Sequence, residues 1–399
     1  MVVLDDLTDP GNLRGLWPPN VSGGRTVVTT RRRDAALFGA GRTLVGVDLF
    51  TPAEAEAYLA ARLSARPQLG TGGAGLARDL GYLPLALAQA TAYLIDRGLT
   101  CAEYAVRLRD RRRLAELLPE PGALPDDHES TVAATWSLSI ELADSLVPVR
   151  LARPALELAS LLDPEGIPEE VFTTAAARRW LSEAAGREVD AESARDALRC
   201  LHRVSLAAMD ETSTSRSLRV HALVQRATRD RLPSDRLALA ARTAADALFQ
   251  AWPEVERDHM LGQALRAGTD ALVGHSVAAV WTEEDGGHRV LFRAGKSLGE
   301  VGQPAAAAVY FEQLCSEAVT RLGPDHPDTL STRHHRARWR GEAGDAAGAA
   351  AAMEELLTDR LRVLGPDHPH TLRTRSDLAH WRGQARMPAP TSDNPNYRK

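Results

Sequence analysis

Two adjacent carboxylates follow the first apolar stretch of the chain. Residues Val2–Leu4 have the composition of a strand and run directly into Asp5 and Asp6. A carboxylate at the end of a strand can hold Mg²⁺ through water, and a second carboxylate can orient a water that attacks a phosphate. Asp5 is therefore a candidate metal ligand, and Asp5 and Asp6 are candidate catalytic residues. Many buried strands also end in an acidic turn, so the pair alone is weak evidence for hydrolysis.

Three further stretches contain residues that could act on a nucleotide. "VVTTRRRD" at 27–34 presents Arg31 after a predicted strand, and "GYLPLALAQA" at 81–90 places Pro84 at a predicted helix start. "VHALVQRATRD" at 220–230 contains His221. Each stretch also has a purely structural explanation. These are a solvated run of arginines, a proline in a first helical turn and a histidine that packs beside an apolar strand.

Taken in order, the four stretches resemble the NB-ARC module of the STAND ATPases, signalling NTPases that include plant resistance proteins and apoptotic-protease-activating factors. The resemblance implies a switch that binds ADP or ATP with Mg²⁺. It further implies that Arg31 reaches the terminal phosphate, that Pro84 packs near the adenine and that His221 senses bound ADP. The residues on either side of this histidine differ from those of the family, so the match there is loose.

A phosphate-binding loop should precede the strand that ends in Asp5 and Asp6, and the sequence starts at Met1. "AGKS" at 294–297 ends like such a loop, but the glycine that the motif requires five residues before its Gly-Lys pair is Val290. We therefore expect that this chain alone neither holds ATP tightly nor hydrolyses it. Whether it is an enzyme is left open at this stage.

The composition indicates a soluble, mainly helical protein with more than one domain. The 399 residues are 44% hydrophobic and 25% charged, with a formal net charge of −5, and the abundance of Ala, Leu and Arg favours helices. Cys101, Cys200 and Cys315 lie far apart without metal-ligand spacing, and their odd number argues against a disulfide framework. The sequence contains no long apolar run and no signal peptide, so we expect a cytoplasmic protein without a membrane span.

The pattern of strands, helices and breaks predicts a mainly α fold in five parts. An α/β remnant with strands at 2–4, 26–29 and 43–47 is expected to form a parallel sheet. A hairpin of 205–210 and 217–225 is expected to complete a winged helix. The predicted parts are a nucleotide-binding remnant at 1–50, a helical bundle at 51–118, a winged-helix domain at 131–232, an α-solenoid at 235–386 and a disordered tail at 387–399.

An internal repeat is the strongest signal in the sequence. "LGPDHPDTL" at 322–330 returns as "LGPDHPHTL" at 364–372, a shift of 42 residues that also relates Trp339 to Trp381. The repeat units resemble tetratricopeptide repeats of the kinesin-light-chain type, with two helices in each unit. We expect the tryptophans to pack between successive repeats, and the recurring Asp-His pairs to shape loops rather than hold metal. "HHRARW" at 334–339 could face an acidic ligand, but a solvated helix face is the preferred interpretation.

Three functions are compatible with these features. The first is a STAND-type regulatory NTPase with the repeats as ligand sensor, in which partner and nucleotide shift one equilibrium. The second is an interaction scaffold that binds a protein or peptide on its repeats without nucleotide, and self-association is compatible with either. The third is a DNA-binding regulator, which requires a basic recognition helix. We rank it last because Asp230 and other acids dilute the arginines at 219–231.

Overall fold

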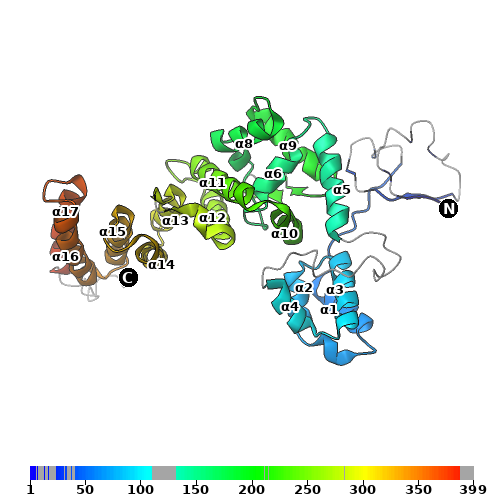
Figure 1. Ribbon diagram of the computed structural model, residues 1–399, viewed down its shortest axis with the longest axis horizontal. Coiled ribbons are helices and arrows are strands. Elements are labelled where there is room, and N and C mark those ends of the chain that lie inside the picture. Colours follow the sequence, from blue (N-terminus) through cyan, green and yellow to red (C-terminus); the bar gives the residue numbers. More distant parts are fainter. Residues whose placement is uncertain are drawn as a thin grey trace, which may run out of the picture. The chain divides into compact units, whose positions relative to one another are not determined.

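The computed structural model describes residues 1–5, 7, 13, 17, 24–30, 32–33, 37, 41–109, 132–210, 212–213, 215–282 and 284–386. The chain divides into two compact units, Met1–Ala247 and Leu248–Lys399, which are considered separately below. Helices make up most of the described structure of both units (Figure 1). This confirms the mainly helical fold class. The predicted tail at 387–399 lies outside the described residues.

The N-terminal strands confirm one expectation and correct another. Strand β1 (Val2–Leu4) pairs in parallel with β2 (Thr26–Val28), as predicted. The strand predicted at 43–47 is wrong, because these residues have no strand assignment. Val45 is 78% exposed and Val47 is 94% exposed. An apolar stretch becomes a strand only where a neighbouring strand accepts its hydrogen bonds, and none of the described residues does so here.

Four helices form a bundle after these strands. Their bounds are Pro52–Arg62 for α1, Gly73–Asp79 for α2, Pro84–Arg97 for α3 and Cys101–Arg109 for α4, with a short 3-10 helix at Pro67–Gly70. The predicted start of α1 is confirmed by a capping box. The Glu54 N–H donates to the Thr51 hydroxyl at 3.3 Å, and the Thr51 N–H donates to the Glu54 carboxylate at 2.8 Å.

Further helices and a small hairpin follow. The helix bounds are Val132–Ser145 (α5), Ala152–Ala159 (α6), Glu170–Thr173 (α7), Ala175–Ala185 (α8), Ala191–Arg203 (α9), Ala222–Arg231 (α10) and Ser234–Ala251 (α11). Strand β3 (Ala208–Met209) pairs antiparallel with β4 (Leu218–Arg219). The predicted strand at 217–225 is therefore too long. His221 caps α10, so its backbone belongs to a helix start. That these elements form a winged helix stays a prediction.

Helix α10 packs against the helical bundle. Leu223 and Ala227 are buried in the same hydrophobic core as residues of α1, α2, α3 and α4. Arg226 donates to the carbonyl oxygen of Leu108 at the end of α4, and Arg229 donates to the carbonyl oxygen of Ser160. Two of the four arginines that could have formed a DNA-binding face therefore bind backbone inside this unit.

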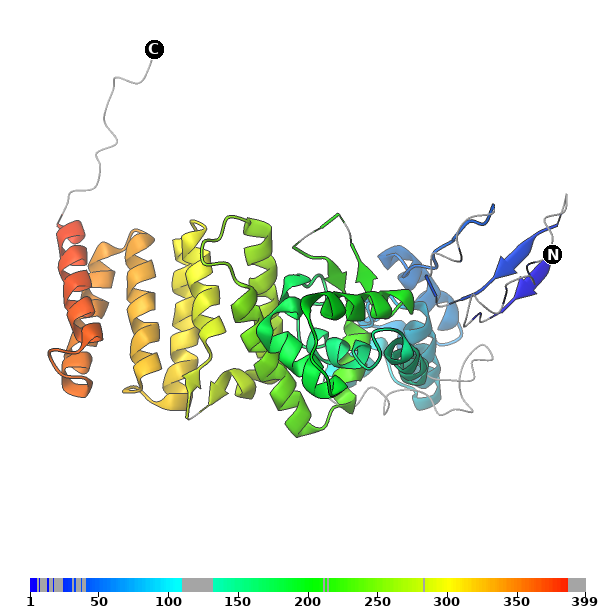
Figure 2. The same cartoon turned by 90° about the horizontal axis from the view of Figure 1, so that it is seen from above.

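The second unit consists of paired helices that stand side by side (Figure 2). Their bounds are His259–Val280 (α12), Arg289–Glu300 (α13), Pro304–Leu322 (α14), Pro327–Glu342 (α15), Ala346–Val363 (α16) and Pro369–Ala385 (α17), with a hairpin of β5 (Trp281–Thr282) and β6 (Gly286–Gly287). Two helices per repeat are confirmed, and Pro327 and Pro369 occupy the first positions of α15 and α17. A proline suits this position because its missing N–H is not needed there.

Histidines cap the first helix of each repeat. The Nδ1 atoms of His288, His326 and His368 accept the backbone N–H two residues later, at 3.2, 3.1 and 3.2 Å. This confirms the structural interpretation of the recurring histidines. No group of three or more metal-binding side chains occurs among the described residues.

Successive repeats meet where a tryptophan ring lies on a glycine. Trp339 and Trp381 are each only 6% exposed, so their predicted packing is confirmed. A Cβ atom placed on Gly299 would lie 2.1 Å from the Trp339 ring, and one on Gly341 would lie 2.7 Å from the Trp381 ring. Only glycine lets the rings approach this closely. Gly383 occupies the same repeat position and has no atom within 4 Å of such a Cβ.

Gly341→Ala tests this contact, with Gly383→Ala as its matched control. Alanine is favoured over glycine in a helix by about 1 kcal/mol, so Gly383→Ala should leave stability unchanged or raise it. Gly341→Ala should instead lower the free energy of unfolding by about 1–3 kcal/mol, because the methyl group overpacks the ring. Urea denaturation measures both. Trp339→Ala should cost about 3–5 kcal/mol. Equal effects of the two glycine substitutions would contradict this account.

Candidate functional site in the helical repeats

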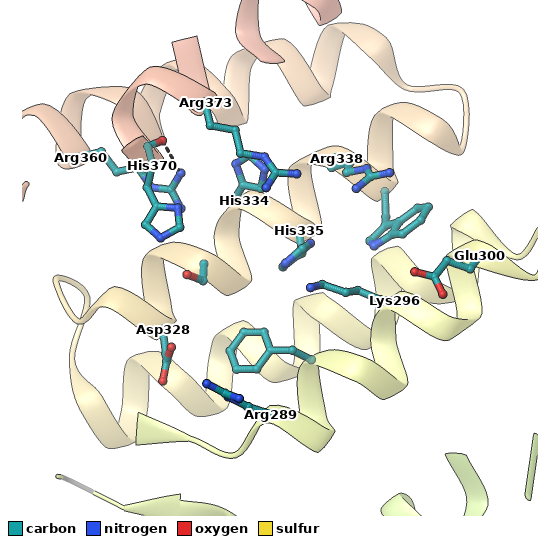
Figure 3. A pocket seen from close by; sticks show the side chains of 13 residues that line it. Arg289, Lys296, Glu300, Asp328, His334, His335, Arg338, Arg360, His370 and Arg373 are labelled. Carbon is teal, nitrogen blue, oxygen red and sulfur yellow. Dashed lines mark hydrogen bonds between the residues drawn. The ribbon is translucent and has the colours of Figure 1, made fainter. Parts of the chain in front are cut away.

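A hollow of about 640 Å³ opens on the side of the second unit that is formed by the first helices of successive repeats (Figure 3). Helices α13, α15 and α17 supply almost all of its walls. The lining residues are Arg289, Phe292, Lys296, Glu300, Asp328, Ser331, His334, His335, Arg338, Trp339, Arg360, His370 and Arg373. Only Arg360 comes from a second helix, α16.

The repeat register explains why these side chains meet. With a shift of 42 residues, Lys296 of α13 corresponds to Arg338 of α15. Arg289 likewise corresponds to Ser331 of α15 and Arg373 of α17. Residues 289 and 296 are seven apart, which places both on one face of a helix. Two of the repeat positions that line the hollow therefore bring four cations to it, namely Arg289, Lys296, Arg338 and Arg373.

The charge of the hollow is positive. Arg289, Lys296, Arg338, Arg360 and Arg373 face two acids, Glu300 and Asp328. Both acids have other partners. A guanidinium nitrogen of Arg293 lies 2.7 Å from the Glu300 carboxylate, and the Gly287 N–H donates to the Asp328 carboxylate at 2.9 Å.

The cations of the hollow differ in the contacts that they already make within the protein. Arg360 is only 2% exposed and donates to the carbonyl oxygens of His370 and Leu330 at 2.9 and 3.0 Å, so it serves structure. Arg338 lies over the Trp339 ring, 4.8 Å from its centre. The Lys296 ammonium points toward His335 (Figure 3). Burial lowers the pKa of Lys296, and Glu300 opposes this shift.

Two neighbouring histidines form the floor of the hollow. His334 is only 5% exposed, and its two ring nitrogens have no hydrogen-bond partner among the described residues. The Asp377 carboxylate lies 3.2 Å from His334 Nε2 but outside hydrogen-bonding geometry. His335 stacks on Phe311 with ring centres 4.8 Å apart, and its Nδ1 is also without a hydrogen-bond partner among the described residues.

Both imidazoles are neutral at physiological pH. Burial lowers the pKa of His334 to about 3, and the Arg360 charge adds to this effect. Burial likewise lowers the pKa of His335 to about 2, with a further contribution from Lys296. The cause in each case is the loss of water around a group that would become charged among cations.

The interpretation of 334–339 as a solvated helix face is wrong. His334, Ala337 and Trp339 are all buried. The repeat could have predicted the burial of this segment. Lys296 and Arg338 share one repeat position, and Trp339 was already expected to face the neighbouring repeat. When an aromatic residue of a helix packs inward, the other residues on the same face of the helix are buried with it.

"AGKS" lies within α13 and is not a phosphate loop, as expected. Gly295 and Ser297 are buried. The Ser297 hydroxyl donates to the Glu256 carboxylate at 2.7 Å, and Arg266 lies 3.2 Å from the same carboxylate. This buried network fixes the helix that carries Lys296.

In the first unit, His221 contacts the turn that precedes Pro84, the other residue of the described chain that the NB-ARC resemblance assigned to the nucleotide. His221 Nδ1 accepts the Leu223 N–H at 3.2 Å, and Nε2 donates to the carbonyl oxygen of Gly81 at 3.0 Å. Gly81 opens the turn that leads into α3, whose first residue is Pro84. Burial lowers the pKa of His221. With one nitrogen accepting and the other donating, the ring is neutral.

The remaining sequence candidates are Asp5, Asp6 and Arg31. Asp5 is exposed and accepts a hydrogen bond from the Thr29 hydroxyl. No hydrogen bond or ion pair links Asp5 to His221 within the described part of the chain. Asp6 and Arg31 lie outside the described residues. The metal and catalytic roles of Asp5 and Asp6 therefore stay predictions.

Comparison with known protein families identifies two segments. The tetratricopeptide repeat family matches residues 329–370, which cover α15, α16 and the start of α17. A domain of unknown function, DUF7779, matches residues 149–237, which include α6 through α10. No curated protein matches the chain. None of the described helices is long and apolar enough to cross a membrane. The match at 329–370 supports tetratricopeptide repeats in this part of the chain, and such a repeat supports a role in protein interaction.

The histidine floor predicts a pH dependence of stability. An unfolded chain protonates histidine near pH 6.5, but the folded chain keeps His335 neutral down to about pH 2. Stability is therefore lost as the pH falls below 6.5, by about 1.4 kcal/mol per pH unit for each such group. In His335→Phe, the slope of unfolding free energy between pH 6.5 and 4.5 should flatten by about this amount.

Urea denaturation at several pH values measures this slope. The control is His259→Asn, which changes an exposed histidine in α12 and should leave the slope unchanged. A wild-type slope in His335→Phe would mean that the folded state protonates His335 normally.

Proposed function

We propose that this protein is an interaction scaffold whose repeats bind a segment of another protein along α13, α15 and α17. The observation that carries the proposal is the hollow between these helices, with buried polar groups that have no hydrogen-bond partner in the described structure. Such groups are costly when they stay unpaired, by about 1–3 kcal/mol each. A bound segment that supplies acceptors would remove this cost.

The architecture suits this role. The Trp339 and Trp381 contacts hold the inner helices in fixed positions, so little freedom is lost on binding. Identical positions recur every 42 residues, which presents an extended ligand with a periodic set of side chains. The hollow is largely polar and charged, which suits a peptide segment better than a nonpolar small molecule.

Photo-crosslinking tests the binding surface. A benzophenone amino acid in place of Ser331, which lines the hollow, should capture one discrete partner in extracts of the native host. The same amino acid at Arg289, which lines the hollow from α13, should capture the same partner, and excess unmodified chain should compete with both reactions. At Glu355, which is exposed on α16, it should capture none. Equal capture from Glu355, or none from the two hollow positions, would overturn the proposal.

A second proposal is that residues 1–247 act as an ADP/ATP switch of the STAND type, with Mg²⁺ as the accompanying ion. The observation that favours it is the hydrogen bond from His221 to Gly81, which ties α10 to the turn before Pro84. In a switch of this kind, a nucleotide at the turn would change the contacts of the histidine. The cytoplasm would supply the nucleotide. ATP hydrolysis by this chain alone is not part of the proposal.

Titration of the purified chain with a fluorescent ADP analogue and Mg²⁺ tests the second proposal. His221→Asn keeps a good N-cap for α10, but its side chain is too short to reach Gly81. Submicromolar to micromolar binding that His221→Asn weakens at least tenfold would support a switch. Exposed Glu192→Ala in α9 is the control. Failure to bind at about 1 mM analogue, equivalent to about −4 kcal/mol, would leave the scaffold function alone.

A further inference from the structure

We propose that one side of α17 binds an amphipathic helix of another protein, in the way that α16 packs on α15. This side, which we call the α17 face, consists of Leu372, Arg375, Ser376, Ala379 and Gly383. None of these residues lines the hollow. The α17 face is therefore a second binding surface, and its role does not depend on a peptide in the hollow. Figure 1 shows α16 and α17 together at one end of the row of repeat helices.

The α17 face runs along the length of the helix. Leu372, Ser376, Ala379 and Gly383 follow one another at intervals of three or four residues, which puts them on one side. Leu372 is 47% exposed, and the other three residues are exposed as well. Trp381 points the other way and is buried. Helix α17 thus packs against the repeats with one side, and none of the described residues covers the other.

The preceding repeat shows how such a face is covered. With the shift of 42 residues, the exposed leucine, serine, alanine and glycine of the α17 face correspond to buried residues of α15. Leu330, the equivalent of Leu372, is fully buried. It lies in one apolar cluster with Ala337 of α15 and with Met353 and Leu356 of α16. Leucine, alanine and glycine recur in both faces, so the α17 face has the residues that accept a helix.

An arginine at the edge of the α17 face indicates that the partner is acidic there. Arg333 of α15 pairs with Asp359 of α16 at 2.7 Å. The guanidinium of its equivalent, Arg375, has no ion pair among the described residues. A helix that covers the α17 face as α16 covers α15 would place a carboxylate there. Gly383 leaves room for an aromatic side chain of the partner, since no atom lies within 4 Å of a Cβ placed on it.

A second copy of this chain fits the α17 face less well. Two copies of the face packed against each other would bring their arginines together and offer no carboxylate to Arg375. The α16 helix of a second copy is already packed between its own α15 and α17. The occupant is therefore a helix of a different protein, with an apolar face and an acidic residue beside it.

Fluorescence anisotropy with the full 399-residue chain tests the inference. The probe is a labelled synthetic peptide with the sequence of residues 345–364, which contains α16. A hydrocarbon staple between positions 351 and 355, both exposed on α16, holds the peptide helical and lowers the ordering cost of binding. The dissociation constant should be below about 100 µM. Leu372→Gln should raise it about tenfold or more, because the apolar contact is lost.

An exchange of charges locates the contact. Arg375→Glu should weaken binding of the probe about tenfold or more, because Glu would repel Asp359 of the peptide. A probe with Asp359→Arg should bind the Arg375→Glu chain more tightly than it binds the wild-type chain. The matched control is Arg257→Glu, which makes the same change of charge at an exposed position before α12 and should leave the affinity unchanged. Circular dichroism confirms that each variant is folded.

Four results would overturn the inference. They are no binding of the probe, equal binding to wild type and Leu372→Gln, equal loss with Arg257→Glu, and no recovery in the charge exchange. Sedimentation equilibrium of the chain alone should show a monomer. A dimer that Leu372→Gln dissociates would assign the α17 face to a second copy instead. Crosslinking through Ser331 in the hollow should persist in Leu372→Gln, so the two surfaces stand or fall separately.

Discussion

The contact between a tryptophan and a glycine one repeat earlier determines the geometry of the C-terminal unit. Trp339 lies on Gly299, and Trp381 lies on Gly341. A flat ring on a bare backbone brings neighbouring helices as close as side-chain packing permits. Two such contacts, one repeat apart, place α13, α15 and α17 in register. The same contacts that stabilise the repeats therefore decide which residues share the inner face.

That register explains how like charges come to share one hollow. Because Lys296 and Arg338 occupy equivalent positions on successive helices, stacking the helices necessarily brings their charges near each other. The rest of the structure tolerates this arrangement because both histidines of the floor stay neutral and because hydrophobic clusters elsewhere supply the stability. One such cluster around Met353, Leu356 and Trp381 is almost wholly buried. A cluster of cations that does not stabilise its own fold is more readily understood as a binding feature.

Features that depend on neighbouring residues could be predicted from the sequence, but contacts between distant segments could not. The helix start at Pro84 and the period of 42 residues each depend on neighbours in the chain, and the structure shows both. The segment at 43–47 has the composition of a strand, yet whether it forms one depends on pairing with a distant segment of the chain. Likewise, no local signal tells whether His334 faces water or the next repeat. To predict the burial of His334, the shift of 42 residues must be applied to the side chains of the helices as well as to the loops.

His221 shows how a histidine that looks functional in the sequence can have a structural role. His221 resembles a nucleotide sensor by its place in the sequence, but its two nitrogens already have partners in Leu223 and Gly81. The capping bond is the same one that His288 and His326 make at repeat helices, so helix capping alone accounts for part of its role. Only the bond to Gly81 is particular to it, and a nucleotide would have to compete with that bond.

His334 and His335 stand in the opposite situation. Neither caps a helix, and the two ring nitrogens of His334 and the Nδ1 of His335 have no hydrogen-bond partner among the described residues. A native fold rarely leaves such groups unpaired without a reason. Structural need explains His221 well and explains the histidine floor poorly. The physical argument for a ligand is therefore stronger in the repeats than at the turn where the sequence motifs first directed attention.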